Sequence, residues 1–227
     1  MSKYLNLKNI LLVFISIAVI VTAYFFFAEQ KTQVPLNMTV QEKKARFKAI
    51  MLPVAQEVYG ELLQRYNDVA AEIKDGNSAQ FTDLKKEYKA SSDKALLMAF
   101  KPHPISITLA QAAMESAWAS SRFFIEENNV FGVWSFDEDE PRIAAGERRG
   151  NKTIWVRKYS SVKAAVRDYY RTLARGSAFD EFRAARVKTS DPHQIVKKLD
   201  SYSEKGAEYG EELSAIINYN KFQQYDK

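Results

Sequence analysis

Glu115 is the residue of this sequence whose surroundings best suit acid–base chemistry. The whole chain is 27% charged, yet Glu115 is the only charged side chain between Ile105 and Ser121. Its neighbours there are apolar at nearly every position of a helix, which predicts a buried helix. Burial removes water from a carboxylate and raises its pKa toward the working pH, as a general acid requires. The stretch therefore suggests a proton donor.

A polar strip runs along the same predicted helix. Thr108, Gln111 and Glu115 follow one another at steps of three and four residues, which places them on one side. An ordinary alternative is that Glu115 is solvated or paired with an arginine. The following segment, Asn128 to Trp134, combines side-chain amides with aromatic rings, and such groups hold sugar rings by hydrogen bonding and stacking. This combination favours a carbohydrate site.

The composition excludes several other kinds of chemistry. The 227 residues include no cysteine and two histidines, which excludes disulfides, thiol catalysis and cysteine-bound metals and leaves little for a histidine-based metal site. We therefore expect no metal and no organic cofactor. The net charge of +5 is too small to select an anionic partner. The basic residues carry no nucleic-acid motif, so no nucleic-acid partner is expected.

An uncharged apolar segment lies near the N-terminus. The nineteen residues from Ile10 to Ala28 are close to the length that crosses a bilayer. This run is longer than the core of most signal peptides and ends in aromatic residues rather than a small-residue cleavage site. Lys3 and Lys8 precede it, so the positive-inside rule keeps the N-terminus in the cytoplasm. We expect a single-pass inner-membrane protein with its main domain on the periplasmic side.

The rest of the sequence predicts a mostly helical α+β domain. Apolar residues recur at helical spacing from Gln41 to Lys74, where Pro53 should bend the helix. Further helices are predicted at residues 81–88, 93–100, 105–119, 122–127, 161–175, 191–199 and 208–219. Glycines and the β-favouring run Thr153 to Val156 predict a small β-hairpin between residues 131 and 159. The expected organisation is an anchor at 1–30, a tether and helical region at 31–90 and a catalytic domain at 91–227.

Several segments together resemble a known family. LAQAAMESAW (109–118), SRF (121–123) and NNVFG (128–132) are similar to the AQAAxESxWGxSrf and NNlFG signature of bacterial N-acetylglucosaminidases that act on peptidoglycan. That family includes the flagellar-rod hydrolase domain. LDSYSEKGAEY (199–209) further resembles the YSERGxxYxxxI ending of its Bax branch. The resemblance covers about residues 94–226, and Ala119 departs from it, because the family usually has glycine there.

The resemblance implies a lysozyme-like fold with a cleft beside the β lobe. It also implies cleavage of the β-1,4 bond on the reducing side of N-acetylglucosamine, with Glu115 as the general acid. Relatives place a second carboxylate on the hairpin, where Glu147 is the candidate base. A solvated hairpin charge is an equal alternative at Glu147, and the acidic run Asp137 to Glu140 offers rivals. In another route, the substrate's own 2-acetamido group would attack the anomeric carbon, and no second carboxylate would be needed as nucleophile.

The remaining candidates concern substrate binding. Gln111, Asn129, Phe131 and Trp134 are the candidate substrate-binding residues. Tyr202 matches the family's C-terminal tyrosine, and it would either hydrogen-bond the acetamido group or the water, or serve as a core aromatic residue. The expected partners are peptidoglycan glycan strands and the inner membrane, and the sequence does not indicate an oligomeric state. A muramidase or lytic transglycosylase and a non-catalytic glycan-binding scaffold remain as alternatives.

Overall fold

The computed structural model describes residues 37–149 and 152–226, without the side chains of residues 147–149 and 152. The predicted membrane span, Ile10 to Ala28, lies outside the described residues and stays a prediction. Within the described part of the chain, no helix is both long and apolar enough to cross a bilayer. The chain divides into two units, Met1–Met38 and Thr39–Lys227, and every described helix and strand belongs to the second.

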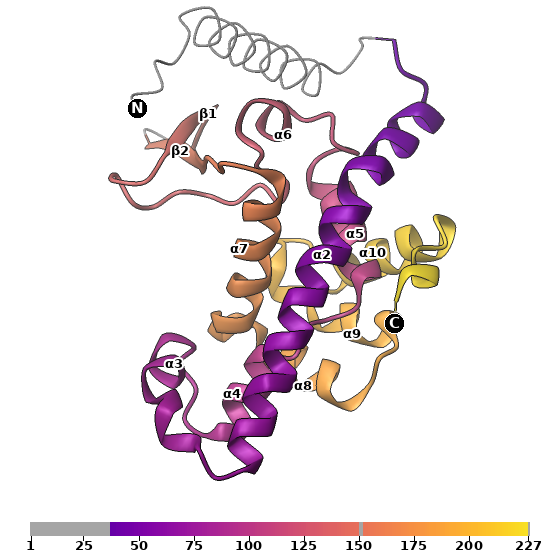
Figure 1. Cartoon of the computed structure of the whole chain (residues 1–227). Helices are drawn as coiled ribbons and strands as arrows, with labels where there is room; N and C mark the ends of the chain where they lie inside the picture. Colours follow the sequence, from indigo (N-terminus) through magenta and orange to yellow (C-terminus); the bar gives the residue numbers. More distant parts are fainter. Residues whose placement is uncertain (1–36, 150–151, 227) are drawn as a thin grey trace, which may run out of the picture. The chain divides into compact units, whose positions relative to one another are not determined.

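Helices make up most of this second unit (Figure 1). The α-helices are α2 (Val40–Lys74), α3 (Thr82–Glu87), α4 (Asp93–Phe100), α5 (Ile105–Glu115), α6 (Arg122–Glu127), α7 (Val162–Arg175), α8 (Asp180–Lys188), α9 (Pro192–Ile195) and α10 (Ala207–Tyr219). Short 3-10 turns lie at Ser78–Phe81, Ser177–Phe179, Val196–Lys198, Asp200–Tyr202 and Phe222–Tyr225. The two strands are β1 (Arg142–Arg149) and β2 (Lys152–Arg157).

Helix α2 begins at a capping box and covers the helix that carries Glu115. The Thr39 side chain accepts from the backbone N–H of Glu42, and the Glu42 carboxylate accepts from the backbone N–H of Thr39 at 2.7 Å. Phe47, Met51 and Val58 are fully buried on one side of α2. Helix α2 packs against both α5 and α7. Its long apolar face therefore closes one side of the core.

Helix α5 is the most deeply buried element of the unit. Nine of its eleven residues are buried, and they run without interruption from Ile105 to Ala113. It contacts α2 and α10, and Figure 1 shows it behind α2. The burial that the apolar pattern predicted is confirmed. The helix ends at Glu115 and not at Ala119, so it is shorter than the sequence pattern indicated.

The β lobe is a single antiparallel hairpin. Strands β1 and β2 pair with Arg142 opposite Arg157, and the register is interrupted between Ala144 and Arg148. The chain leaves β2 and enters α7 shortly afterwards (Figure 1). This arrangement confirms the predicted mostly helical class with a small two-stranded sheet.

Helix α8 has no counterpart among the helices that the sequence pattern predicted. Phe182 is its one buried apolar residue, and its other buried side chains are Arg183 and Arg186. Arg186 is 2% exposed and donates from Nη2 to the carbonyls of Met98 and Ala99, at 2.9 and 2.8 Å. Those carbonyls belong to the last turn of α4, where they lack partners within their own helix. Polar bonds to α4 thus hold α8 in place.

Replacing Arg186 by methionine should destabilise the fold. Methionine keeps much of the apolar stem but leaves two buried carbonyls without a donor, so the free energy of unfolding should fall by about 2–4 kcal/mol. Urea unfolding of the purified protein would measure the loss. Lys188→Met, on the exposed side of the same helix, is the matched control and should change stability by less than about 0.5 kcal/mol. Equal losses in both variants would contradict the role of Arg186.

Candidate active site

Glu115 lies at the C-terminal end of α5 because the residues after it stop the helix. The hydroxyl of the buried Ser116 donates to the Ala112 carbonyl at 2.5 Å and accepts from the backbone N–H of Ala119 at 2.8 Å. Residues 117–119 then have φ values of 49°, 61° and 60°, which is a left-handed turn. Glycine adopts such angles without strain, which explains why the family usually has glycine at the position of Ala119.

The Glu115 carboxylate is held at one of its two oxygens. The Tyr209 hydroxyl, from the first turn of α10, donates to Glu115 Oε1 at 2.8 Å. No described residue hydrogen-bonds Oε2, which lies 4.0 Å from the place that a Cβ on Gly132 would take. Gly132 has a φ of 63°, so a side chain there would strain the backbone, and its Cβ would be in van der Waals contact with the carboxylate. The NNVFG segment therefore meets α5 at Glu115.

The surroundings of Glu115 suit a group that must carry a proton. Burial raises the pKa of the Glu115 carboxyl above its ordinary value, while the Tyr209 hydrogen bond and the positive charge of Lys205 lower it. Burial is the largest of these effects. Glu115 is also the last residue of α5, and the negative end of a helix dipole disfavours a carboxylate there. The carboxyl thus takes up a proton more readily than an exposed glutamate.

A chain of buried polar groups leads from Tyr209 into the core. Gln111 donates from Nε2 to the Tyr209 hydroxyl at 2.9 Å, and its Oε1 accepts from the Tyr169 hydroxyl at 2.5 Å. His103 Nε2 lies 3.1 Å from the Tyr169 hydroxyl. Because Tyr169 gives its single proton to Gln111, it must accept from His103. Burial and the nearby charge of Arg186 lower the pKa of His103, so its ring is neutral.

Three of the four predicted substrate-binding residues lie inside the protein. Gln111 is fully buried and uses both ends of its amide on tyrosines. Asn129 is 1% exposed, and its amide binds the backbone of Val133 and the carbonyl of Arg157 at 2.8–3.0 Å. Phe131 is stacked on Tyr169 with ring centroids 4.0 Å apart. The described contacts of these three side chains are thus to other groups of the protein, and their role in substrate binding stays a prediction.

Trp134 differs from the other three because it reaches the surface. It is 39% exposed, and the neighbouring Phe136 is 85% exposed, with ring centroids 6.2 Å apart. The backbone of Trp134 bridges to Val156 of β2, which ties this aromatic pair to the hairpin. The pair thus presents exposed aromatic surface on which a sugar ring could stack.

Tyr202 stands beside the pair of Glu115 and Tyr209. Its ring stacks on that of Tyr209, with centroids 5.4 Å apart and planes 13° apart. Burial and the charge of Glu115 raise the pKa of the Tyr202 hydroxyl, so it stays protonated. The tyrosine that contacts Glu115 is Tyr209, which is not among the residues predicted for the site. The sequence could have indicated Tyr209, because it ends the same YSEKGAEY stretch that begins with Tyr202 and lies at the start of a predicted helix.

The second carboxylate stays a prediction. Glu147 belongs to β1, but its side chain lies outside the described residues. Among the rivals, Glu140 pairs with Arg157, at 2.8 Å between Oε2 and Nε. The other three acidic residues of that run, Asp137 to Asp139, are exposed. Glu140 therefore has a structural partner of its own.

The family of the chain follows from comparison with known proteins. The family model for glucosaminidase, described as mannosyl-glycoprotein endo-beta-N-acetylglucosaminidase, matches residues 95–222. This match covers more than half of the 227 residues. The chain belongs to the glucosaminidase family, as the resemblance of its motifs predicted.

Individual proteins are similar over parts of their length. Protein bax of Escherichia coli is 28% identical over 157 residues, which cover 63% of this chain and 55% of the relative. Exo-glucosaminidase LytG of Bacillus subtilis is 24% identical over 194 residues, which cover 80% and 65%. The chain thus spans less than two thirds of either curated relative. The truncated glycoside hydrolase domain of FlgJ from Salmonella typhimurium is 27% identical, with a TM-score of 0.41 and coverage of 60% and 97%.

Replacing Tyr209 by phenylalanine should change how activity depends on pH. The hydrogen bond from Tyr209 lowers the pKa of Glu115, so its loss should raise that pKa further. A general acid acts in its protonated form, so the alkaline limb of the kcat/KM profile on purified cell wall should move to higher pH. Loss of the positioning bond should also lower kcat about 10-fold.

Lys205→Gln is the companion variant for this experiment. It removes a positive charge that also lowers the pKa of Glu115 but leaves the Tyr209 bond in place. The alkaline limb should move in the same direction, with kcat retained. An unchanged limb in both variants would show that Glu115 does not set the pH profile.

Proposed function

We propose that this protein is a peptidoglycan hydrolase that cleaves the β-1,4 bond after N-acetylglucosamine with Glu115 as the general acid. The observation that carries the proposal is the Glu115 carboxyl, whose pKa is raised by burial and which is held by a single hydroxyl. Membership of the glucosaminidase family supports a glycosidase. The similarity to a protein named exo-glucosaminidase supports the same class of bond.

The proposed step is protonation of the leaving group. Glu115 in its protonated form gives its proton to the glycosidic oxygen as the bond to the anomeric carbon breaks. Tyr209 fixes the orientation of the carboxyl and stabilises the carboxylate that remains. Gln111 and Tyr169 in turn hold the Tyr209 hydroxyl, because each bond of the chain sets the direction of the next. Oε2, on the side of Gly132, is the oxygen that would deliver the proton.

Attack on the anomeric carbon requires a second group, and two routes remain open. In the first, Glu147 acts as a base on the attacking water. In the second, the 2-acetamido group of the substrate attacks the anomeric carbon, and no second protein carboxylate is needed. Tyr202 would orient the acetamido group or the water in either route, and its position against Tyr209 supports this role.

The proposal includes a location. Residues 10–28 would anchor the protein in the inner membrane by a single span, with the glucosaminidase domain in the periplasm. The uncharged stretch of nineteen residues and the lysines before it support this topology. The tether that follows would keep the domain close to the membrane-facing side of the cell wall.

Replacing Glu115 by glutamine should abolish hydrolysis while preserving the fold. Glutamine keeps the shape but cannot give up a proton in the same way, so the rate should fall about 10²–10⁴-fold. The folded-state pKa of Glu115 is raised, so its ionised form destabilises the fold at pH values above its unfolded-state pKa. The variant should therefore melt at the same or a slightly higher temperature at pH 7. Muropeptide release and thermal unfolding, measured side by side, would test both expectations.

The products of the same assay distinguish the alternatives. We expect new reducing ends on N-acetylglucosamine, and equal release by the wild type and Glu115→Gln would remove Glu115 from the mechanism. A 1,6-anhydro-muramic product would identify a lytic transglycosylase, and a reducing-end muramic acid would identify a muramidase. Glycan binding without any product would indicate a scaffold. Glu147→Gln in parallel would separate the base route, which it blocks, from the acetamido route, which it leaves intact.

Trp134→Ala should weaken the binding of glycan strands. Loss of an exposed aromatic platform removes about 0.5–1.5 kcal/mol of stacking, so KM should rise about 2–10-fold with kcat nearly unchanged. Tyr219→Ala is the matched control, because Tyr219 is 80% exposed and lies at the opposite end of α10 from Tyr209. Equal effects of the two substitutions would argue against a platform at Trp134.

A further inference from the structure

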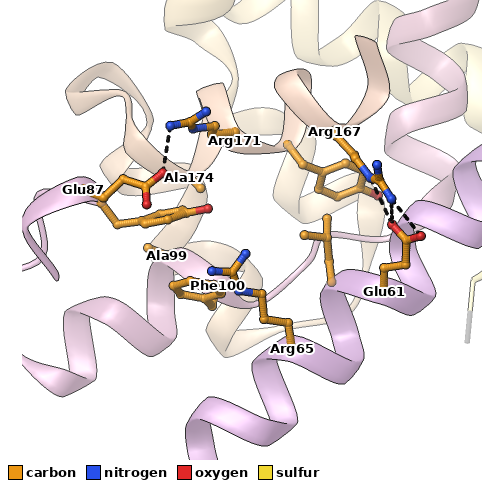
Figure 2. A pocket seen from close by; sticks show the side chains of 11 residues that line it. Glu61, Arg65, Glu87, Ala99, Phe100, Arg167, Arg171 and Ala174 are labelled. Carbon is orange, nitrogen blue, oxygen red and sulfur yellow. Dashed lines mark hydrogen bonds and ion pairs between the residues drawn. The ribbon is translucent and has the colours of Figure 1, made fainter. Parts of the chain in front are cut away.

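A pocket lies between α2, α3, α4 and α7 (Figure 2), and Glu115 is not among the residues that line it. Its volume is about 380 Å³, within the range of small-ligand sites. None of its lining residues is one of the groups that join Glu115 to His103, although the ring of Tyr170 stacks on that of His103 with centroids 4.2 Å apart. The lining residues with apolar surface are Leu62, Tyr88, Ala99, Phe100, Tyr170 and Ala174. The charged ones are Glu61, Arg65, Glu87, Arg167 and Arg171.

Two of the three arginines at this pocket are neutralised and held in place. Arg167 binds both carboxylate oxygens of Glu61, with Nη2 at 2.9 and 2.7 Å. Arg171 donates from Nη2 to Glu87 Oε1 at 2.8 Å. Each pair joins α7 to another helix, the first to α2 and the second to α3. The dashed lines in Figure 2 mark these ion pairs at the rim of the pocket.

Arg65 is the third arginine, and no described carboxylate pairs with it. Its guanidinium carbon lies 5.0 Å from the centroid of the Phe100 ring. Phe100 is in turn 4.6 Å from the ring of Tyr88, centroid to centroid. Figure 2 shows Arg65 and Arg171 on different sides of the pocket. Phe100, beneath Arg65, is 5% exposed, so the apolar floor of the pocket is formed by the half-buried Tyr88 and Leu62. The pocket combines this floor with three guanidinium groups against two carboxylates, which leaves one positive charge uncompensated.

We infer that this pocket binds the C-terminal residue of a peptide that ends in an apolar side chain. The planar guanidinium of Arg65 matches the two oxygens of a terminal carboxylate. The apolar side chain of the same residue would lie on Tyr88 and Leu62, the half-buried apolar residues of the lining. A small inorganic anion has no apolar group to contact the floor of the pocket. A neutral apolar molecule has no negative charge to pair with Arg65. This site is independent of the role proposed for Glu115.

The test uses a matched pair of peptides and the full-length protein in detergent micelles. N-acetyl-Gly-Phe with a free carboxylate and the same peptide as its C-terminal amide are compared by ligand-observed NMR. The free acid should bind at least about 10-fold more tightly than the amide, because the charge-assisted bond is lost in the amide. Glu115→Gln should bind the free acid as the wild type does, which separates this site from the proposed active site.

Arg65→Gln provides the decisive variant. Arg65 is exposed and has no ion pair to lose, so the fold should survive, and affinity for the free acid should fall about 10-fold. Lys197→Gln removes one exposed positive charge from another surface and should leave affinity unchanged. Equal affinity for acid and amide, or undiminished affinity in Arg65→Gln, would overturn the inference. Inorganic phosphate that competes as well as the peptide would also overturn it, because a simple anion site needs no apolar floor.

Discussion

The hydrogen bond from the Tyr209 hydroxyl to Glu115 is the interaction on which the site depends. A carboxylate taken out of water with no donor would be too costly to keep charged, and one with several donors would hold a low pKa and serve only as a structural anion. A carboxylate with one neutral donor, as at Glu115, is intermediate between these two cases. It orients the carboxyl and lets burial dominate its pKa. Because the same bond joins α5 to α10, the position of the Glu115 carboxyl depends on how these two helices pack.

The polar groups behind this bond explain why so many motif residues are buried. Gln111 presents its amide to Tyr209 and Tyr169, and Asn129 ties its loop to the backbone of Arg157. With the loop fixed, Gly132 comes close to the carboxylate without a side chain between them. The motif is therefore mainly a support that sets one acidic side chain at the edge of an apolar helix. The aromatic surface at Trp134 remains the part that faces outward.

Helix α2 connects the two sites that we propose. One side of it supplies Phe47, Met51 and Val58 to the core that buries α5. Farther along, Glu61 and Arg65 line the pocket shared with α4 and α7. A single long helix thus supports the proposed general acid and carries a residue of the proposed second site.

The sequence by itself determined those features that are encoded by the pattern of neighbouring residues. A lone acid in an apolar helix, the helical class, the small hairpin and the family could all be predicted, because neighbouring residues carry each of those signals. Tertiary structure alone decided that Tyr209 contacts Glu115, that Asn129 and Phe131 turn inward, and that Arg186 holds α8 to α4. The bond from Tyr209 spans 94 positions and that from Arg167 to Glu61 spans 106. Contacts at such separations depend on how whole helices pack, and they leave no periodic trace in the chain.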